Sequence, residues 1–176
     1  ELTITGVKFE LIPTAGDIPE HMMVWLPEER VLLSGDLLGG TFPYVESARY
    51  EPDRDPSAMV ASLDLALSLK PQSVVPGHGR LLVGSSDVTE NLVLNRDLIQ
   101  YLVDQVDRMV IQGLNADQLV ESFTLPEVFA EHPDLQPYYH RVEWMLRGMF
   151  MKRAGWNGDI IDLVGLGERR ESAKLI

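Results

Sequence analysis

The chain has 176 residues, 45% of them hydrophobic, so it can bury a sizeable core in one large domain or two small ones. Its net charge of −12 argues against a nucleic-acid partner, because phosphate backbones are bound by basic surfaces. Cysteine is absent, which excludes disulfides, thiolate metal sites and cysteine nucleophiles, and no apolar run approaches the roughly 20 residues that span a bilayer.

The first twelve residues predict a half-buried strand. Ile4, Val7, Phe9 and Leu11 alternate with polar neighbours, apart from one slip at Gly6. The stretch has neither an initiating methionine nor the charged start of a signal peptide. We therefore expect the chain to be part of a longer protein that begins upstream of Glu1. The sequence does not determine the cellular compartment, because any targeting signal would lie upstream.

Two short apolar runs come next and predict a β-hairpin. They span residues 22–27 and 30–35 and are joined by a polar pair of glutamates. A long loop rich in glycine, proline and charge is expected from Asp36 to about Asp55.

A helix and a further strand complete the first part of the chain. Asp55 and Pro56 form a good helix start, with a capping side chain followed by proline at the first helical position, and the helix is expected to end near Lys70. The apolar run at 73–76 predicts a short buried strand. Residues 1–83 therefore have the predicted order β-β-β-α-β.

The pattern changes to helices in residues 84–155. Apolar side chains at helical spacing predict a long helix from Ser86 to about Gln112, with Gly113 as its stop. Caps and prolines predict three shorter helices, which begin at Asn115, Pro126 and Pro137. The glycine-containing residues 156–176 are expected to form a loosely structured tail.

Three side chains that could bind a metal stand where strands give way to loops. Asp36 follows the second run of the hairpin, His78 follows the strand at 73–76, and Asp17 lies in the loop before the hairpin. Singly, each is explained as a turn, cap or surface residue. Together they offer two carboxylates and one imidazole, a set that suits a divalent metal. Their spacing alone does not establish that they converge.

The stretch "MMVWLPEERVLLSGDLLGG" followed by "SVVPGHGRLL" resembles the second half of a metallo-β-lactamase-fold hydrolase. In that superfamily the Asp of "GD" bridges two zinc ions and the His of "PGHG" ligates the second, which implies these roles for Asp36 and His78. A further ligand lies 19 residues before the bridging acid, at Asp17. That position is most often His in the superfamily but a carboxylate in the alkyl sulfatase branch. His21 is close enough to compete with Asp17 as the ligand.

Residues 101–150 resemble the dimerisation domain that follows the catalytic domain in alkyl sulfatases. The resemblance implies a homodimer formed through residues 84–155. It also implies two substrate-binding residues, Arg49, which lies 13 residues after the bridging acid and would contact sulfate, and Tyr139 from the helical part. A second sulfate-contacting position, Asn in the family, is Tyr44 here, so that contact departs from the pattern.

The implied fold is α/β: the C-terminal half of an αββα metallo-β-lactamase sandwich in residues 1–83, then an all-α dimerisation domain in 84–155 and a tail in 156–176. The implied function is part of a zinc-dependent hydrolase that cleaves a sulfate ester, or a related small-molecule ester, by a metal-activated water, with two zinc ions in the complete enzyme. The superfamily's "HxHxDH" motif is absent. We therefore expect a partner segment that carries it, or else a non-catalytic dimerisation or binding module.

Overall fold

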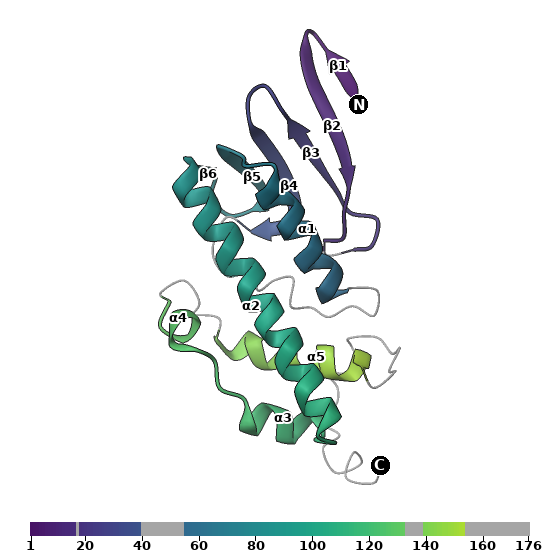
Figure 1. Ribbon diagram of the computed structural model, residues 1–176, viewed down its shortest axis with the longest axis vertical. Helices are drawn as coiled ribbons and strands as arrows, with labels where there is room; N and C mark the ends of the chain where they lie inside the picture. Colours follow the sequence, from purple (N-terminus) through teal and green to yellow (C-terminus); the bar gives the residue numbers. More distant parts are fainter. Residues whose placement is uncertain (17, 40–54, 133–138, 154–176) are drawn as a thin grey trace.

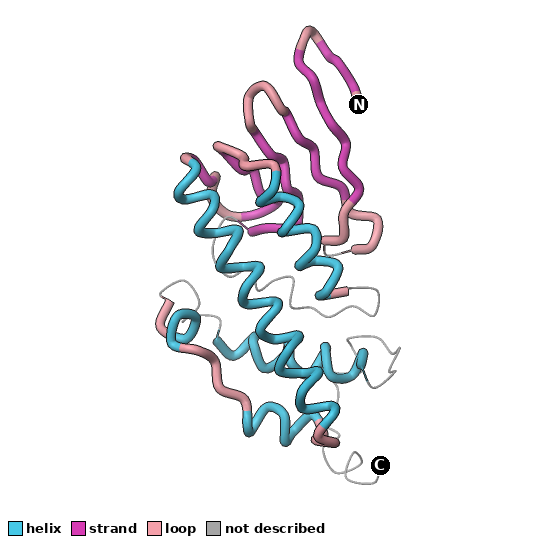
Figure 2. Tube along the Cα trace, in the orientation of Figure 1, coloured by secondary structure: helices cyan, strands magenta, loops and turns pink. Residues whose placement is uncertain are grey.

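All the described strands lie at one end of the molecule in the computed structural model, which describes residues 1–16, 18–39, 55–132 and 139–153. Figure 1 shows a sheet beside α1 (Pro56–Ser68) and the first half of the long helix α2 (Ser85–Ile111). The remaining helices gather around the second half of α2, and Figure 2 shows the same division by type of element.

The described residues form one six-stranded sheet whose spatial order follows the chain order. Neighbouring strands are antiparallel, except β4 and β5, which are parallel. Helix α1 connects these two strands, as a parallel pair requires a crossover. The strands are β1 (Leu2–Ile4), β2 (Val7–Pro13), β3 (Met22–Leu26), β4 (Val31–Gly39), β5 (Ser73–His78) and β6 (Leu82–Val83).

The prediction of a single strand over the first twelve residues is wrong. Thr5 and Gly6 both have positive φ, at 50° and 88°, and form a tight turn that separates β1 from β2. Positive φ at both central positions is typical of two-residue hairpin turns, and Ile4 pairs with Val7 across this one. The slip in the alternating pattern at Gly6 therefore marks a turn.

The predicted hairpin is confirmed, but its second strand is longer than the apolar run indicated. β3 and β4 pair through Val24 and Leu33, while β4 continues to Gly39. The extension forms because β5 pairs in parallel with β4 well beyond the end of β3, as far as His78 opposite Gly39. Asp36 consequently lies inside a strand, where the sequence predicted the start of a loop.

One face of the sheet is buried in the core. Trp25, Leu32, Val74 and Leu82 are in register across β3 to β6 and are 0–6% exposed. They belong to one hydrophobic cluster with the apolar side chains of α1 and α2. The predicted start of α1 is confirmed, since the Asp55 side chain accepts hydrogen bonds from the backbone of the first helical turn.

The other face carries a second apolar row. Leu11, Val24, Leu33 and Val75 are in register across β2 to β5 and share this face. At the ends of the row, Leu11 and Val75 are 40% and 38% exposed. We call these four residues the open-face row. Within the described part of the chain, other side chains cover this row less than they cover the buried row on the opposite face.

The described part of residues 84–155 consists of helices joined by short turns and loops. Helix α2 packs on α1, β5 and β6 with its first half and on α5 with its second, so one continuous helix joins the two parts (Figure 1). Ion pairs tie α5 to α2 and α3, through Arg153 with Asp107 and Arg147 with Asp117, each at 2.7 Å. The smaller helices are α3 (Ala116–Ser122), α4 (Glu127–Ala130) and α5 (Tyr139–Arg153).

The predicted capping box of α3 is also confirmed, with Asn115 and Gln118 bonding reciprocally to each other's backbone. None of the described helices combines the length and apolar character needed to cross a membrane.

Candidate functional site

Asp36 and His78 lie together at one edge of the sheet. Because β4 and β5 run parallel, their carboxyl ends meet at the same edge, and the two side chains come from those ends. His78 Nε2 lies 3.4 Å from Asp36 Oδ1. The side chains are 60% and 33% exposed, respectively, so the pair is accessible from solvent.

An irregularity in β4 directs Asp36 toward β5. The register with β5 shifts on both sides of Gly35, which has φ of +50°. Shifts of this kind mark β-bulges, which bend a strand and re-aim its side chains, often beside functional sites. Here the irregular segment carries Asp36 next to a positive-φ glycine.

The two glycines beside His78 have different roles. Gly79 has φ of +83°, which lets the backbone bend directly after His78. Gly77 has another function, because a Cβ atom there would lie 1.9 Å from Asp36 Oδ1. The carboxylate of Asp36 therefore occupies the space that a side chain at Gly77 would fill.

The geometry of the pair fits shared binding of one divalent cation. Zinc bonds to nitrogen and oxygen are about 2.0–2.2 Å, so two ligands on a tetrahedral ion lie roughly 3.3 Å apart. The 3.4 Å between His78 Nε2 and Asp36 Oδ1 matches that separation. Two ligands are fewer than the three that a catalytic zinc generally needs. No cluster of three or more metal-binding side chains occurs within residues 1–16, 18–39, 55–132 and 139–153.

The other predicted site residues are not described. Asp17 and Arg49 lie outside the described residues, and Tyr139 begins α5 with its side chain outside them. Their roles in metal and substrate binding stay predictions.

His21, the alternative to Asp17, is enclosed beside β4. The residue is 9% exposed, and its Nδ1 lies 2.8 Å from Thr14 Oγ1. A Cβ atom at Gly35 would lie 2.9 Å from His21 Nε2, and one at Gly16 would lie 2.5 Å from its Cγ. The imidazole thus fits between two glycine backbones and holds the loop that precedes β3.

Sequence reasoning missed an ion pair close to His78 along the chain. Arg80 and Asp87 form two hydrogen bonds of 2.7 Å between guanidinium and carboxylate. The hydrogen bonds from Arg80 hold the pKa of the Asp87 carboxyl below its usual value, so Asp87 is ionised at neutral pH. The available signal was an acid in the first turn of a helix, preceded by an arginine in the connecting loop.

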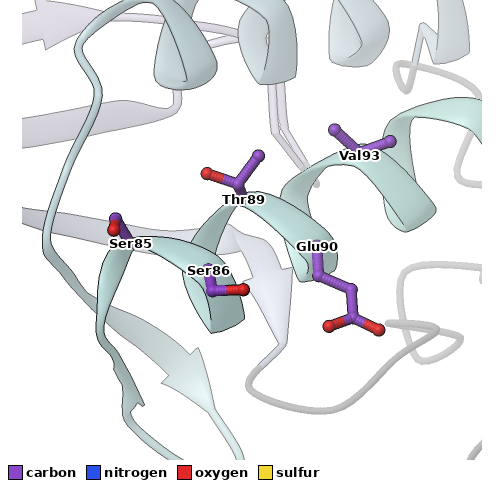
Figure 3. A pocket seen from close by; sticks show the side chains of 5 residues that line it. All are labelled: Ser85, Ser86, Thr89, Glu90 and Val93. Carbon is purple, nitrogen blue, oxygen red and sulfur yellow. The ribbon is translucent and has the colours of Figure 1, made fainter.

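A shallow hollow on the first turns of α2 does not form a second metal-binding site. Its lining side chains all come from this helix, and they include a single carboxylate and no imidazole (Figure 3). The lining residues are Ser85, Ser86, Thr89, Glu90 and Val93.

Sequence comparisons connect the chain to a known superfamily. The family model described as "Metallo-beta-lactamase superfamily" matches residues 1–78. A linear primary-alkylsulfatase from Pseudomonas sp. (strain ATCC 19151) is 35% identical over 100% of this chain and 34% of its own length. An alkyl/aryl-sulfatase of Saccharomyces cerevisiae is 24% identical over 89% of this chain and 25% of its own length. The chain thus spans about a third or less of these relatives.

Solved structures show the same fold. A stereoselective inverting sec-alkylsulfatase from Pseudomonas sp. superimposes with a TM-score of 0.69 at 19% identity, covering 92% of this chain and 26% of that one. A metallo-β-lactamase family protein from Thermus thermophilus has a TM-score of 0.51 at 17% identity, covering 88% and 47%. The mixed α/β architecture with its six-stranded sheet matches these neighbours. Residues 1–78 are therefore similar to the metallo-β-lactamase superfamily, and the chain as a whole is similar to alkylsulfatases.

Proposed function

We propose that the chain is part of a zinc-dependent hydrolase that cleaves sulfate esters, or a related small-molecule ester. The observation that carries this proposal is the placement of Asp36 and His78 at a distance suited to one shared cation. The similarity to alkylsulfatases along the whole chain supports sulfate esters as the substrate class.

In the proposed site, Asp36 would serve both zinc ions, Asp17 would be a ligand of the first and His78 would be a ligand of the second. When bound, zinc lowers the pKa of water to about 7 and so supplies a nucleophile at neutral pH. Gly77 leaves the space that lets the Asp36 carboxylate face His78. The roles of Arg49 and Tyr139 in binding the substrate rest on sequence resemblance alone.

The remaining zinc ligands come, in this proposal, from a segment bearing "HxHxDH" that packs on the open-face row. This row is apolar and partly exposed, as suits a second sheet packed about 10 Å away. The relatives are about three times as long as the region that matches, which leaves room for such a segment. Burial of Leu11 and Val75 would add to the stability of the assembly.

We further propose the division into a catalytic part at 1–83, a dimerisation domain at 84–155 and a tail at 156–176. Helix α2 starts at the proposed boundary and contacts both parts. A homodimer through residues 84–155 would therefore connect to the site through a single helix.

A non-catalytic dimerisation or binding module is the second candidate. It is favoured by one observation, that the sequence of this chain has no "HxHxDH" motif.

One experiment separates the two candidates. The chain is assembled with the segment that carries "HxHxDH", and zinc content is measured by mass spectrometry beside sulfate release from a linear alkyl sulfate. The hydrolase proposal predicts two zinc ions per chain and release of sulfate, both reduced by His78→Ala. Less than one zinc per chain in the complete assembly, without sulfate release, would establish the non-catalytic module instead.

A further inference from the structure

His78 is supported by the sheet on one side only. β4 pairs with β5 as far as His78, whereas β6 pairs only with Ser73 and Val74. On the β6 side, residues 75–78 thus extend past the strand pairing that the structure describes. The backbone that carries His78 therefore runs directly into the connection between β5 and β6.

Arg80 anchors that connection to helix α2. Its Nη1 and Nη2 atoms donate to Asp87 Oδ2 and Oδ1, each at 2.7 Å. Nη1 also donates to the carbonyl oxygen of Leu81 at 3.2 Å. A bidentate pair between guanidinium and carboxylate fixes direction as well as distance. The backbone two residues after His78 is thereby tied to the first turn of the helix.

Asp87 is itself held in place. The buried Asn91 donates from Nδ2 to Asp87 Oδ1 at 3.1 Å and to its carbonyl oxygen at 3.0 Å. The backbone N–H of Val83 donates to Asp87 Oδ2 at 3.4 Å. Hydrogen bonds from α2 and from β6 therefore hold the Asp87 carboxylate that accepts from Arg80.

A glycine with positive φ stands at each end of the same connection, and a backbone hydrogen bond holds the later one. Gly79 and Gly84 take φ of +83° and +92°, and the N–H of Gly84 donates to the carbonyl oxygen of Gln72 at 2.8 Å. Gly79 is the residue directly after His78, and its permissive backbone would let the imidazole swing. Between these two glycines, the pairing of Arg80 with Asp87 restricts that freedom.

We propose that Arg80 and Asp87 are positioning residues whose ion pair holds the turn after β5, so that the His78 imidazole faces the Asp36 carboxylate. This inference rests on the proposed function, because it takes His78 as a zinc ligand. Arg80 and Asp87 act through His78 and do not themselves ligate metal. At 52% and 33% exposure the pair adds little to global stability, so its effect is local order.

The test compares Arg80→Gln and Asp87→Asn with the control Arg96→Gln. Arg96 lies further along α2 and pairs with Asp64 at 2.9 Å, so its loss removes a similar exposed ion pair from the same helix. Hydrogen–deuterium exchange of residues 77–81 reports the order of the turn without metal. Zinc affinity, measured by competition with a chromophoric chelator in the assembly with the "HxHxDH" segment, reports the position of the imidazole.

Both turn variants should speed exchange at residues 77–81 about five-fold and weaken zinc binding about ten-fold, while Arg96→Gln changes neither. Exchange as slow as in the unmodified protein, or zinc affinity equal to that of the control, would overturn the inference. The variant His78→Ala distinguishes failure of the proposed function from failure of the positioning role of Arg80 and Asp87. If it weakens zinc binding, the proposed function stands whatever the turn variants do. If it leaves zinc binding unchanged, the proposed function fails and the inference fails with it.

Discussion

Replacement of Gly77 by alanine tests how the site is built. The added Cβ atom would lie 1.9 Å from Asp36 Oδ1 and 3.0 Å from the carbonyl carbon of Gly35. Non-bonded contacts to a Cβ atom essentially never fall below 3.0 Å, so the carboxylate must move by about 1 Å. Gly77 is not among the glycines with positive φ, which means that alanine adds a clash without backbone strain.

The cost should be modest for folding and large for metal binding. Overpacking costs typically about 1–3 kcal/mol, and the flexible Asp36 side chain can relieve part of it by rotating. A displacement of about 1 Å removes a carboxylate oxygen from a zinc bond of about 2 Å. Misplacement on this scale typically costs about 100-fold in function. We therefore expect about 100-fold weaker zinc binding in a protein that still folds.

The assays are urea unfolding and chelator competition for zinc, with Gly113→Ala as the matched control. Gly113 has φ of +75°, and a Cβ atom added there would meet nothing within 4 Å, so its replacement strains the backbone without touching the site. In an Asp36→Ala background the clash disappears, and Gly77→Ala should cost at least about 1 kcal/mol less than in the parent. Equal costs in both backgrounds, or zinc affinity unchanged by Gly77→Ala, would refute the reasoning.

Three further outcomes follow from the structure. Because Arg80 holds the pKa of Asp87 below the usual 3.8, the pair stabilises the fold above that pH and the contribution is lost as pH falls through the lower folded-state pKa. Acid titrations should show Asp87→Asn slightly less stable than the parent at pH 7, with the difference shrinking as pH falls through the folded-state pKa; a constant difference would contradict the linkage. Asp55→Ala removes the cap of α1 and should cost about 1 kcal/mol in urea unfolding, against no change for the exposed Glu29→Ala. Leu33→Lys on the open-face row should prevent co-purification with the "HxHxDH" segment while Leu65→Lys, on an exposed part of α1, does not; equal recovery would argue against docking there.

The sequence predicted elements whose signals are local. Asp55 and Pro56 start α1, and Asn115 and Gln118 cap α3, because capping depends on residues within one turn. It misjudged the first strand because a turn of Thr5 and Gly6 looks like one irregular step in an alternating pattern. It placed Asp36 in a loop because the partner that extends β4 is β5, more than thirty residues away along the chain.

The site could be predicted as a set of residue types but not as a geometry. Asp36 and His78 were recognisable because each follows an apolar run, and their approach to 3.4 Å depends on the parallel pairing of β4 with β5. The space above Gly77 and the enclosure of His21 by Gly16 and Gly35 leave no sequence pattern, since they arise where distant backbones approach. The Arg80–Asp87 pair similarly depends on the position of the first turn of α2 relative to the loop between β5 and β6.

The central claim is that Asp36 and His78 bind the same zinc ion. Anomalous diffraction at the zinc absorption edge, from crystals of the zinc-loaded assembly, tests it most directly. Shared binding predicts a zinc peak about 2.0–2.2 Å from both Asp36 Oδ1 and His78 Nε2. A fully loaded assembly with its zinc elsewhere, and with the two side chains in contact only with each other, would contradict it.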